Sequence, residues 1–321
     1  GFPPSGGRPK SPLRGSEMKL KTKPKLSVWQ FLALGFLIVI LTGSLLLMLP
    51  FASSGRDGQS TSYINALFTA TSATCVTGLV PYDSNTHWTI FGQVVIICLI
   101  QTGGLGFMTF VSVLLGAIRK NLGLYERKAL MLSAGEEQLS GIKRLVRRIF
   151  IGTAIFEGTG AVFLAIRFIP DFGVGKGIYY AIWHSISAFC NAGFDIIGNY
   201  ASLTAYYDDA LVCVTIMALI TIGGLGFLVW DDIKRNKLNW RRYELQTKLV
   251  LVTSAVLTVG GAVIFFFLER NRMNADMTFG EQVLVSFFSS VTPRTAGYNS
   301  VDTAALSPGS KLLTIILMFI G

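Results

Sequence analysis

Three short segments of the sequence each end in a glycine and could present backbone carbonyl groups to a cation. Each follows an apolar stretch that contains Phe or Trp and then a cluster of Ser and Thr. A glycine can adopt φ > 0, so it turns its carbonyl where other residues cannot. Carbonyl oxygens arranged around an axis replace the hydration shell of a cation. The aligned runs are 66–79, 181–194 and 285–298, and their glycines are Gly78, Gly193 and Gly297.

One such segment alone would more simply be a Gly-containing turn between packed helices. Three copies with the same Ser/Thr-rich helix before them favour an ion-binding role. We expect those helices near residues 62–74, 177–189 and 279–292. Their partly negative C-terminal ends would face the ion, which also favours a cation.

Other chemistry is not predicted by the sequence. It has no nucleophile–base constellation, P-loop or dinucleotide fingerprint, so we do not expect an enzyme. The four cysteines lie in or beside apolar segments without CxxC spacing and are expected to be small buried thiols. His87 and His184 have no Cys, Asp or Glu at ligand spacing. No tightly bound cofactor or metal is therefore expected beyond a transported ion.

Long apolar stretches must position these segments. Of 321 residues, 51% are hydrophobic and 14% are charged, against about 25% charged in soluble domains. A run of about 20 apolar residues crosses a bilayer as a helix, whereas a helix of 10–14 residues suggests re-entrance. The chain is therefore predicted to be a polytopic membrane protein. Its expected spanning helices are 28–49 and 88–118, 149–169 and 211–230, and 249–269 and 311–321.

The basic residues indicate the orientation in the membrane. The net charge is +10, and Lys and Arg gather before the first unit and between units, at 19–25, 119–128 with 143–148, and 234–248. This positive-inside pattern predicts a cytoplasmic N-terminus and cytoplasmic connections. Since the charge follows the membrane topology, we expect contact with anionic lipid headgroups and no nucleic acid.

The second helices repeat as well, because LIQTGGLGF at 99–107 matches LITIGGLGF at 219–227. The predicted fold class is an all-α integral membrane protein built from tandem parallel helix–pore loop–helix repeats. The expected division is a flexible tail (1–25), a first repeat (26–118), a cytoplasmic linker (119–148), a second repeat (149–233), a second linker (234–248) and an incomplete third repeat (249–321).

These motifs resemble the Trk/Ktr/HKT potassium transporter superfamily. The resemblance rests on TCVTGL at 74–79, NAGF at 191–194, TPRTAGY at 292–298 and the GGLGF repeats. It covers nearly everything from about residue 25 onward. The similarity is greatest to the Ktr membrane subunit KtrB, because no additional hairpin precedes the first unit.

The resemblance implies one potassium-channel-like pore of pseudo-fourfold symmetry, made by four repeats in a single chain in the plasma membrane. It implies potassium as the transported ion, with sodium as the alternative, a homodimer of pore subunits, and control by a cytosolic ring of nucleotide-binding subunits. The selectivity filter would use the backbone carbonyls of Cys75, Val76, Thr77, Gly78, Cys190, Asn191, Ala192, Gly193, Arg294, Thr295, Ala296 and Gly297.

Two departures from the family pattern stand out. Cys75 and Cys190 occupy positions where Thr and Asn are expected. The fourth repeat, and the loop that interrupts the third repeat's second helix, are missing. The chain as written is therefore not expected to conduct alone, and the natural protein is expected to continue by about one repeat or this chain to be truncated. The alternatives are a secondary transporter of another solute and a sodium-permeable cation transporter.

Some single residues carry their own alternatives. Arg294 could brace its loop from behind or form an ion pair at the outer mouth. Glu157, within an apolar helix, is expected to have a structural role rather than a functional one. The paired glycines at 103–104 and 223–224 are expected to allow close helix packing rather than to act as hinges.

Overall fold

Helices and connecting loops make up the computed structural model, which describes residues 28–55, 60–106, 142–237, 239–272 and 274–321. Within these ranges the sheet-type pairing is one isolated bridge between Ser53 and Trp88. The all-α fold class is therefore confirmed for the described residues. The α-helices are α1 (Val28–Leu47), α2 (Tyr63–Thr74), α3 (Ile90–Gly104), α6 (Ile142–Phe172), α7 (Val174–Phe189), α8 (Ala210–Gly224), α9 (Phe227–Asn236), α10 (Leu245–Glu269), α11 (Phe279–Val291) and α12 (Pro308–Ile320).

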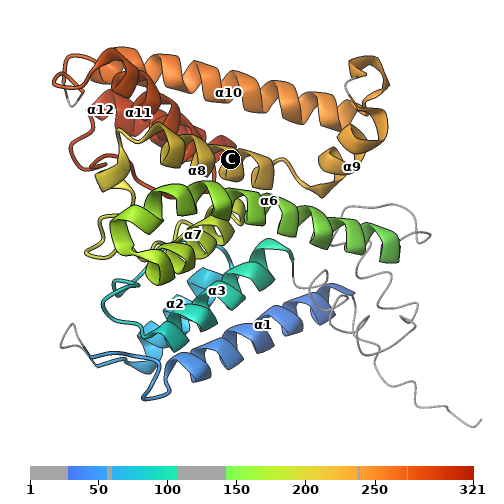
Figure 1. The fold of residues 1–321 in the computed structure, drawn as a ribbon. Helices are drawn as coiled ribbons and strands as arrows, with labels where there is room; N and C mark the ends of the chain where they lie inside the picture. Colours follow the sequence, from blue (N-terminus) through green and yellow to red (C-terminus); the bar gives the residue numbers. More distant parts are fainter. Residues whose placement is uncertain (1–27, 56–59, 107–141, 238, 273) are drawn as a thin grey trace, which may run out of the picture.

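The helices form three groups in one order (Figure 1). Each group has a first helix, a short helix and a second helix: α1–α2–α3, α6–α7–α8 and α10–α11–α12. In every group the short helix packs against both of its neighbours. Helices α1, α6 and α10 run in the same direction across the picture, so the groups are parallel rather than inverted.

Neighbouring groups are joined by one kind of contact. The second helix of one group packs against the short helix of the next, as α3 does on α7 and α8 does on α11. The first group therefore contacts the second through the same pair of helices as the second group contacts the third.

Polar N-caps set the start of most of these helices. Ser62 accepts the Asn65 N–H and so begins α2, and Thr278 begins α11 with a capping box closed by Glu281. Such side chains satisfy N–H groups that lack a helical partner. The second helices begin in the same way, at Thr89 for α3, Asp209 for α8 and Ser307 for α12.

The GGLGF motif ends a helix, which corrects the prediction of one continuous helix over 211–230. Helix α8 stops at Gly224, and α9 leaves at 93° to it. Gly226 has φ 86°, a left-handed conformation that glycine adopts without steric cost and that commonly ends helices. Helix α3 likewise stops at Gly104 and is followed by Gly106 with φ 77°. The predicted helix 88–118 is therefore too long at both ends, and residues 107–118 lie outside the described part.

The other predicted helices agree with the structure to within a few residues at most ends. The short helix expected at 177–189 begins three residues earlier, at Val174. Its start is set by Gly173, whose φ of 80° separates it from α6 with a single residue. Helix α6 is longer than the expected 149–169 at both ends: it begins at Ile142, within the segment predicted as a linker, and continues through Pro170 to Phe172.

In the part of the chain that the structure describes, two helices are long and apolar enough to cross a membrane, Arg147–Phe172 within α6 and Leu245–Glu269. The bent pair α8 and α9 would make a third if it counts as one span. Large apolar side chains remain exposed along the outward faces of α6 and α10, including Val162, Val256 and Phe267. Such faces suit the hydrocarbon region of a bilayer, and the chain is accordingly treated as a membrane protein.

The middle group supplies the buried centre of the molecule. On α7, Trp183 and His184 are almost inaccessible to solvent, and Tyr298 of the third group reaches the same region. His184 Nδ1 lies 2.8 Å from the Tyr180 carbonyl, and the Ile196 N–H donates to Nε2. His184 is therefore a satisfied core residue, as expected from the sequence.

Gly103 and Gly223 allow the second helices to touch the ends of the short helices. A Cβ at Gly103 would lie 2.0 Å from the Thr74 carbonyl oxygen, and one at Gly223 would lie 1.9 Å from that of Phe189. Contacts this short cannot be kept, so either the helix or the loop would have to move. Close packing, the role expected for these glycines, therefore accounts for both.

We predict that Gly103→Ala and Gly223→Ala each destabilise the protein by roughly 1–3 kcal/mol, the usual cost of overpacking a tight site. Gly158→Ala and Gly260→Ala are matched controls, because a Cβ at either helical glycine meets nothing within 4 Å. The measurement is the temperature at which detergent-purified protein loses its monodisperse chromatographic peak. Equal melting of all four variants would contradict the packing argument.

Candidate functional site

The first candidate loop begins as the C-terminal cap of its short helix. The Val76 N–H donates to the Ala73 carbonyl at 3.3 Å, and the Thr77 N–H donates to the Ser72 carbonyl at 2.8 Å. These two bonds form a Schellman motif, in which the residue after the cap is left-handed. The second loop repeats both bonds, from Asn191 to Ala188 at 3.1 Å and from Ala192 to Ser187 at 2.8 Å.

All three loops place left-handed residues at the same two positions. A positive φ at every second residue occurs in neither a helix nor a strand, so these segments leave the regular hydrogen bonding of secondary structure. The φ values are 55° at Val76 and 82° at Gly78, 56° at Asn191 and 67° at Gly193, and 68° at Thr295 and 81° at Gly297.

Two of these positions hold side chains that disfavour a left-handed backbone. Val76 and Thr295 are β-branched, and a positive φ is unusual for such residues. Holding one costs on the order of 1–3 kcal/mol and is maintained only when the surroundings determine it. Asn191, at the equivalent position, tolerates this conformation far better.

The third loop reaches the same conformation by a different route. Helix α11 ends at Val291, and Pro293 then lacks an N–H group. The Thr292 carbonyl accepts the N–H groups of both Ala296 and Gly297 at 3.1 Å. A tight turn therefore replaces the Schellman motif of the other two loops.

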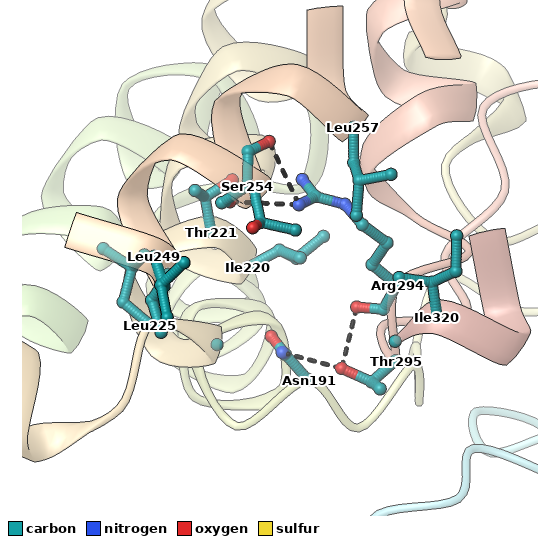
Figure 2. Close-up of a pocket in the computed structure, with 14 residues that line it drawn as sticks. Asn191, Ile220, Thr221, Leu225, Leu249, Ser254, Leu257, Arg294, Thr295 and Ile320 are labelled. Carbon is teal, nitrogen blue, oxygen red and sulfur yellow. Dashed lines mark hydrogen bonds between the residues drawn. The ribbon is translucent and has the colours of Figure 1, made fainter. Parts of the chain in front are cut away.

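The structure brings the three loops together in sequence order. A Cβ at Gly78 would lie 2.6 Å from the Ala192 carbonyl oxygen, and one at Gly193 would lie 2.3 Å from the Ala296 carbonyl oxygen. The first and second loops therefore each set their glycine against the carbonyl that precedes the next loop's glycine. The side-chain amide of Asn191 also hydrogen-bonds the Thr295 hydroxyl at 3.1 Å (Figure 2).

Arg294 is held from behind its loop. Its Nη1 donates to the Ser254 hydroxyl at 3.0 Å, and its Nη2 donates to the Thr258 hydroxyl. Figure 2 shows the guanidinium directed toward Ser254 and Leu257, away from Asn191. Among the described residues no carboxylate lies within ion-pair distance. Of the two alternatives for Arg294, the geometry favours the brace over the ion pair.

Two hollows border the loops. One of about 320 Å³ is lined by Asn191, Thr295 and Arg294 together with residues of α8 and α10 (Figure 2). The other, of about 680 Å³, lies between the first and third loops and is lined by Cys75, Thr77 and Gly297 among others. The second and third loops are thus in contact, whereas open space separates the first from the third.

Two carboxyl groups lie close to the end of the second loop. Burial raises the pKa of Asp195 to about 6, the nearby charge of Asp83 adds to the rise, and the N–H group of Ile197 opposes it. Asp195 is therefore mostly ionised at neutral pH. Asp83, which the sequence did not single out, accepts the Tyr200 N–H at 2.8 Å and so joins the first group to the second.

Side chains do not form an alternative cation site in the described part of the chain. No cluster of three or more His, Cys, Asp or Glu is found there. The backbone carbonyl groups of the three loops are the other candidate oxygen donors in this region, and carbonyl oxygens suit an alkali cation.

Sequence reasoning missed Gln101 on α3. Its side-chain amide donates to Glu157 of α6 at 3.0 Å, and the Cys190 thiol donates to its oxygen at 3.6 Å. One signal was available, because the first GGLGF copy carries Gln where the second carries Thr221. However, a single polar residue in an apolar helix does not indicate which residues it will contact. The residues that Gln101 contacts lie 56 and 89 positions away in the sequence.

Comparison with known proteins places the chain among transport proteins. The family model TrkH, described as a cation transport protein, matches residues 29–321. A potassium/sodium uptake protein, NtpJ of Enterococcus hirae, is 42% identical over 95% of this chain and 66% of its own length. The Ktr system potassium uptake proteins B of Vibrio alginolyticus and Bacillus subtilis are 40% and 38% identical, each over 91% of this chain and 64% of its own length.

A solved structure shares the fold. The crystal structure of the potassium transporter TrkH from Vibrio parahaemolyticus superposes with a TM-score of 0.64 at 18% identity, over 93% of this chain and 57% of that one. The chain thus spans about two thirds of the length of these sequence relatives.

We predict that Arg294→Met lowers the free energy of unfolding by about 1–3 kcal/mol, because hydrogen bonds from a charged donor are lost in a partly buried place. Arg167→Met is the matched control. Its guanidinium is half exposed and pairs with Asp209, and such surface pairs contribute about 0–1 kcal/mol. Thermal unfolding of the purified protein measures both. A larger loss in the control than in Arg294→Met would overturn the brace.

Proposed function

Because this chain belongs to the TrkH family of cation transport proteins, we propose that it carries potassium across the membrane through a filter of backbone carbonyls. The ion-binding groups are the carbonyls of the twelve residues in the three loops. They are Cys75, Val76, Thr77 and Gly78, then Cys190, Asn191, Ala192 and Gly193, then Arg294, Thr295, Ala296 and Gly297.

The alternation of left-handed residues in all three loops carries this proposal. It aligns successive carbonyls on one side of each chain segment, where they can take the place of water around a dehydrated cation. The short helices α2 and α7 run directly into their loops, so their C-terminal ends face the same space. The partial negative charge of those ends stabilises a cation further.

Potassium is the proposed substrate because two relatives are potassium uptake proteins. The relative from Enterococcus hirae is a potassium/sodium uptake protein, so sodium permeation is the alternative substrate for the same site. A secondary transporter of another solute is less favoured, because such folds often use inverted repeats. Helices α1, α6 and α10 run in the same direction (Figure 1).

The proposed pore is pseudo-fourfold, and the three sectors proposed for this chain are the repeats 26–118, 149–233 and 249–321. The cavity of about 680 Å³ between the first and third loops is where a fourth sector would lie. Residues 1–25 are a tail, and 119–148 and 234–248 are linkers on the cytoplasmic side. The proposed setting is the plasma membrane, with several spans and a cytoplasmic N-terminus.

The proposed partners are a second copy of the subunit, a cytosolic nucleotide-binding regulatory ring and membrane lipids. The first two follow from the resemblance to Ktr systems, which the names of three relatives support. The basic linkers suit the anionic headgroups of the inner leaflet. No enzymatic activity is proposed.

We predict that Gly78→Ala and Gly193→Ala raise the KM for potassium uptake about tenfold or more, a loss of about 1.4 kcal/mol in ion binding. Both changes strain a left-handed backbone and drive a Cβ into the next loop's carbonyl. Gly173→Ala is the matched control, since its φ of 80° gives the same strain with nothing within 4 Å.

The measurement is uptake by potassium-auxotrophic cells that express the complete reading frame, with surface expression matched between variants. Gly297→Ala is included to test the third loop. Unaltered uptake and an unaltered potassium/sodium preference in all three loop variants would refute the filter.

A further inference from the structure

Three polar groups from different parts of the chain form a line behind the second loop. Gln101 lies on α3, Glu157 on α6, and Cys190 opens the loop itself. The Gln101 amide nitrogen lies 3.0 and 3.3 Å from the two Glu157 carboxylate oxygens. The Cys190 thiol lies 3.6 Å from the Gln101 carbonyl oxygen.

The chemistry of the three groups gives the line one direction. Gln101 turns its NH₂ group toward Glu157, the orientation that suits the acceptor oxygens of a carboxyl group. Its oxygen then faces Cys190, whose thiol is the donor. Among the described residues no Lys, Arg or His lies within ion-pair distance of Glu157. The amide of Gln101 is therefore its main side-chain contact.

Two further contacts fix the ends of the line. The Ser185 hydroxyl donates to the backbone carbonyl of Glu157 at 2.6 Å, which fastens α7 to α6 at the same point. A Cβ at Gly104 would lie 2.5 Å from the Cys190 sulfur, so α3 packs closely against the half-buried thiol. The start of the second loop cannot shift unless α3 or α6 shifts with it.

The other two loops lack this anchor. The Cys75 thiol is exposed and makes no hydrogen bond within the described residues. Arg294, at the equivalent position of the third loop, is fastened to Ser254 and Thr258 of its own group. Of the residues that open the three loops, Cys190 is the one whose side chain hydrogen-bonds the preceding group within the described residues.

We propose that Gln101 is a positioning residue for ion selection. Its side chain hydrogen-bonds Glu157 on one side and Cys190 on the other, and so fixes the start of the second loop relative to α6. In this way it holds the carbonyls of the second loop at the spacing that favours potassium over sodium. This role rests on the proposed function, since it needs the second loop to bind the ion. Small changes in carbonyl spacing alter the balance between dehydration and coordination, which differs between the two ions.

The test compares potassium and sodium uptake by potassium-auxotrophic cells that express the complete reading frame. The variants are Gln101→Leu, Cys190→Ala, Cys190→Ser and the double variant Gln101→Leu/Cys190→Ala. Cys98→Ala is the matched control, because this thiol lies exposed on the same helix as Gln101. Surface expression is measured for each variant.

Gln101→Leu and Cys190→Ala are each expected to lower the potassium/sodium preference roughly three- to tenfold. The double variant is expected to fall no further than the worse single variant, because residues in one network are not additive. Cys190→Ser is expected to recover most of the preference lost in Cys190→Ala, since a hydroxyl also donates to Gln101. Cys98→Ala is expected to match the unaltered protein.

The outcomes separate the two proposals. No potassium uptake by the unaltered protein would refute the proposed function itself. Normal preference in Gln101→Leu and Cys190→Ala, with or without reduced expression, would overturn the positioning role and leave the filter standing. Should Gln101→Leu fail to reach the membrane, the Cys190 pair decides: equal preference in the Ser and Ala variants would overturn the proposal.

Discussion

Backbone carbonyl groups that leave helical hydrogen bonding inside a membrane protein need another partner, and this requirement governs the structure around the three loops. Water satisfies such groups in a soluble protein. Here the loops are packed among helices, and positive φ values recur at the same two positions in all three loops. In the proposed function a dehydrated cation is the partner of their carbonyl groups. The glycines, the short helices and the tight helix contacts hold the loops in this conformation.

Rigidity in this region comes from packing and not from the loops' own propensities. Val76 and Thr295 oppose their left-handed conformation, so the surrounding helices must impose it. Gly103 and Gly223 let the second helices press on the carbonyls that end the short helices. The conformational cost at the loops is thus offset by close contacts between the second helices and the ends of the short helices.

Much of the fold could be predicted, because length and apolarity decide which segments lie in a membrane. The short helices followed from their Ser/Thr-rich repeat, and their ends were predicted to within a few residues. The bend between α8 and α9 could not be predicted, because the apolar run around it does not indicate that Gly226 adopts a positive φ.

The candidate loops themselves could be predicted from three aligned glycines. Which loop contacts which could not be predicted. The contact of Gly78 with Ala192 joins residues from different repeats, and no local pattern encodes it. Gln101 was missed for the same reason. The role of Gln101 depends on the two groups that it hydrogen-bonds, Glu157 and Cys190, which lie on another helix and in a loop.

The glycine-to-carbonyl contacts have the character of a heterologous, head-to-tail interface repeated within one chain. Each loop offers a glycine on one flank and a carbonyl on the other, and two such junctions are made. The first loop therefore keeps an unused carbonyl flank at Thr77, and the third keeps an unused glycine flank at Gly297, both of which line the cavity of about 680 Å³. A segment that closed this arrangement into a cycle would have to present a carbonyl to Gly297 and a glycine to Thr77. The unused carbonyl of the first loop and the unused glycine of the third loop therefore define the backbone groups that such a segment would need.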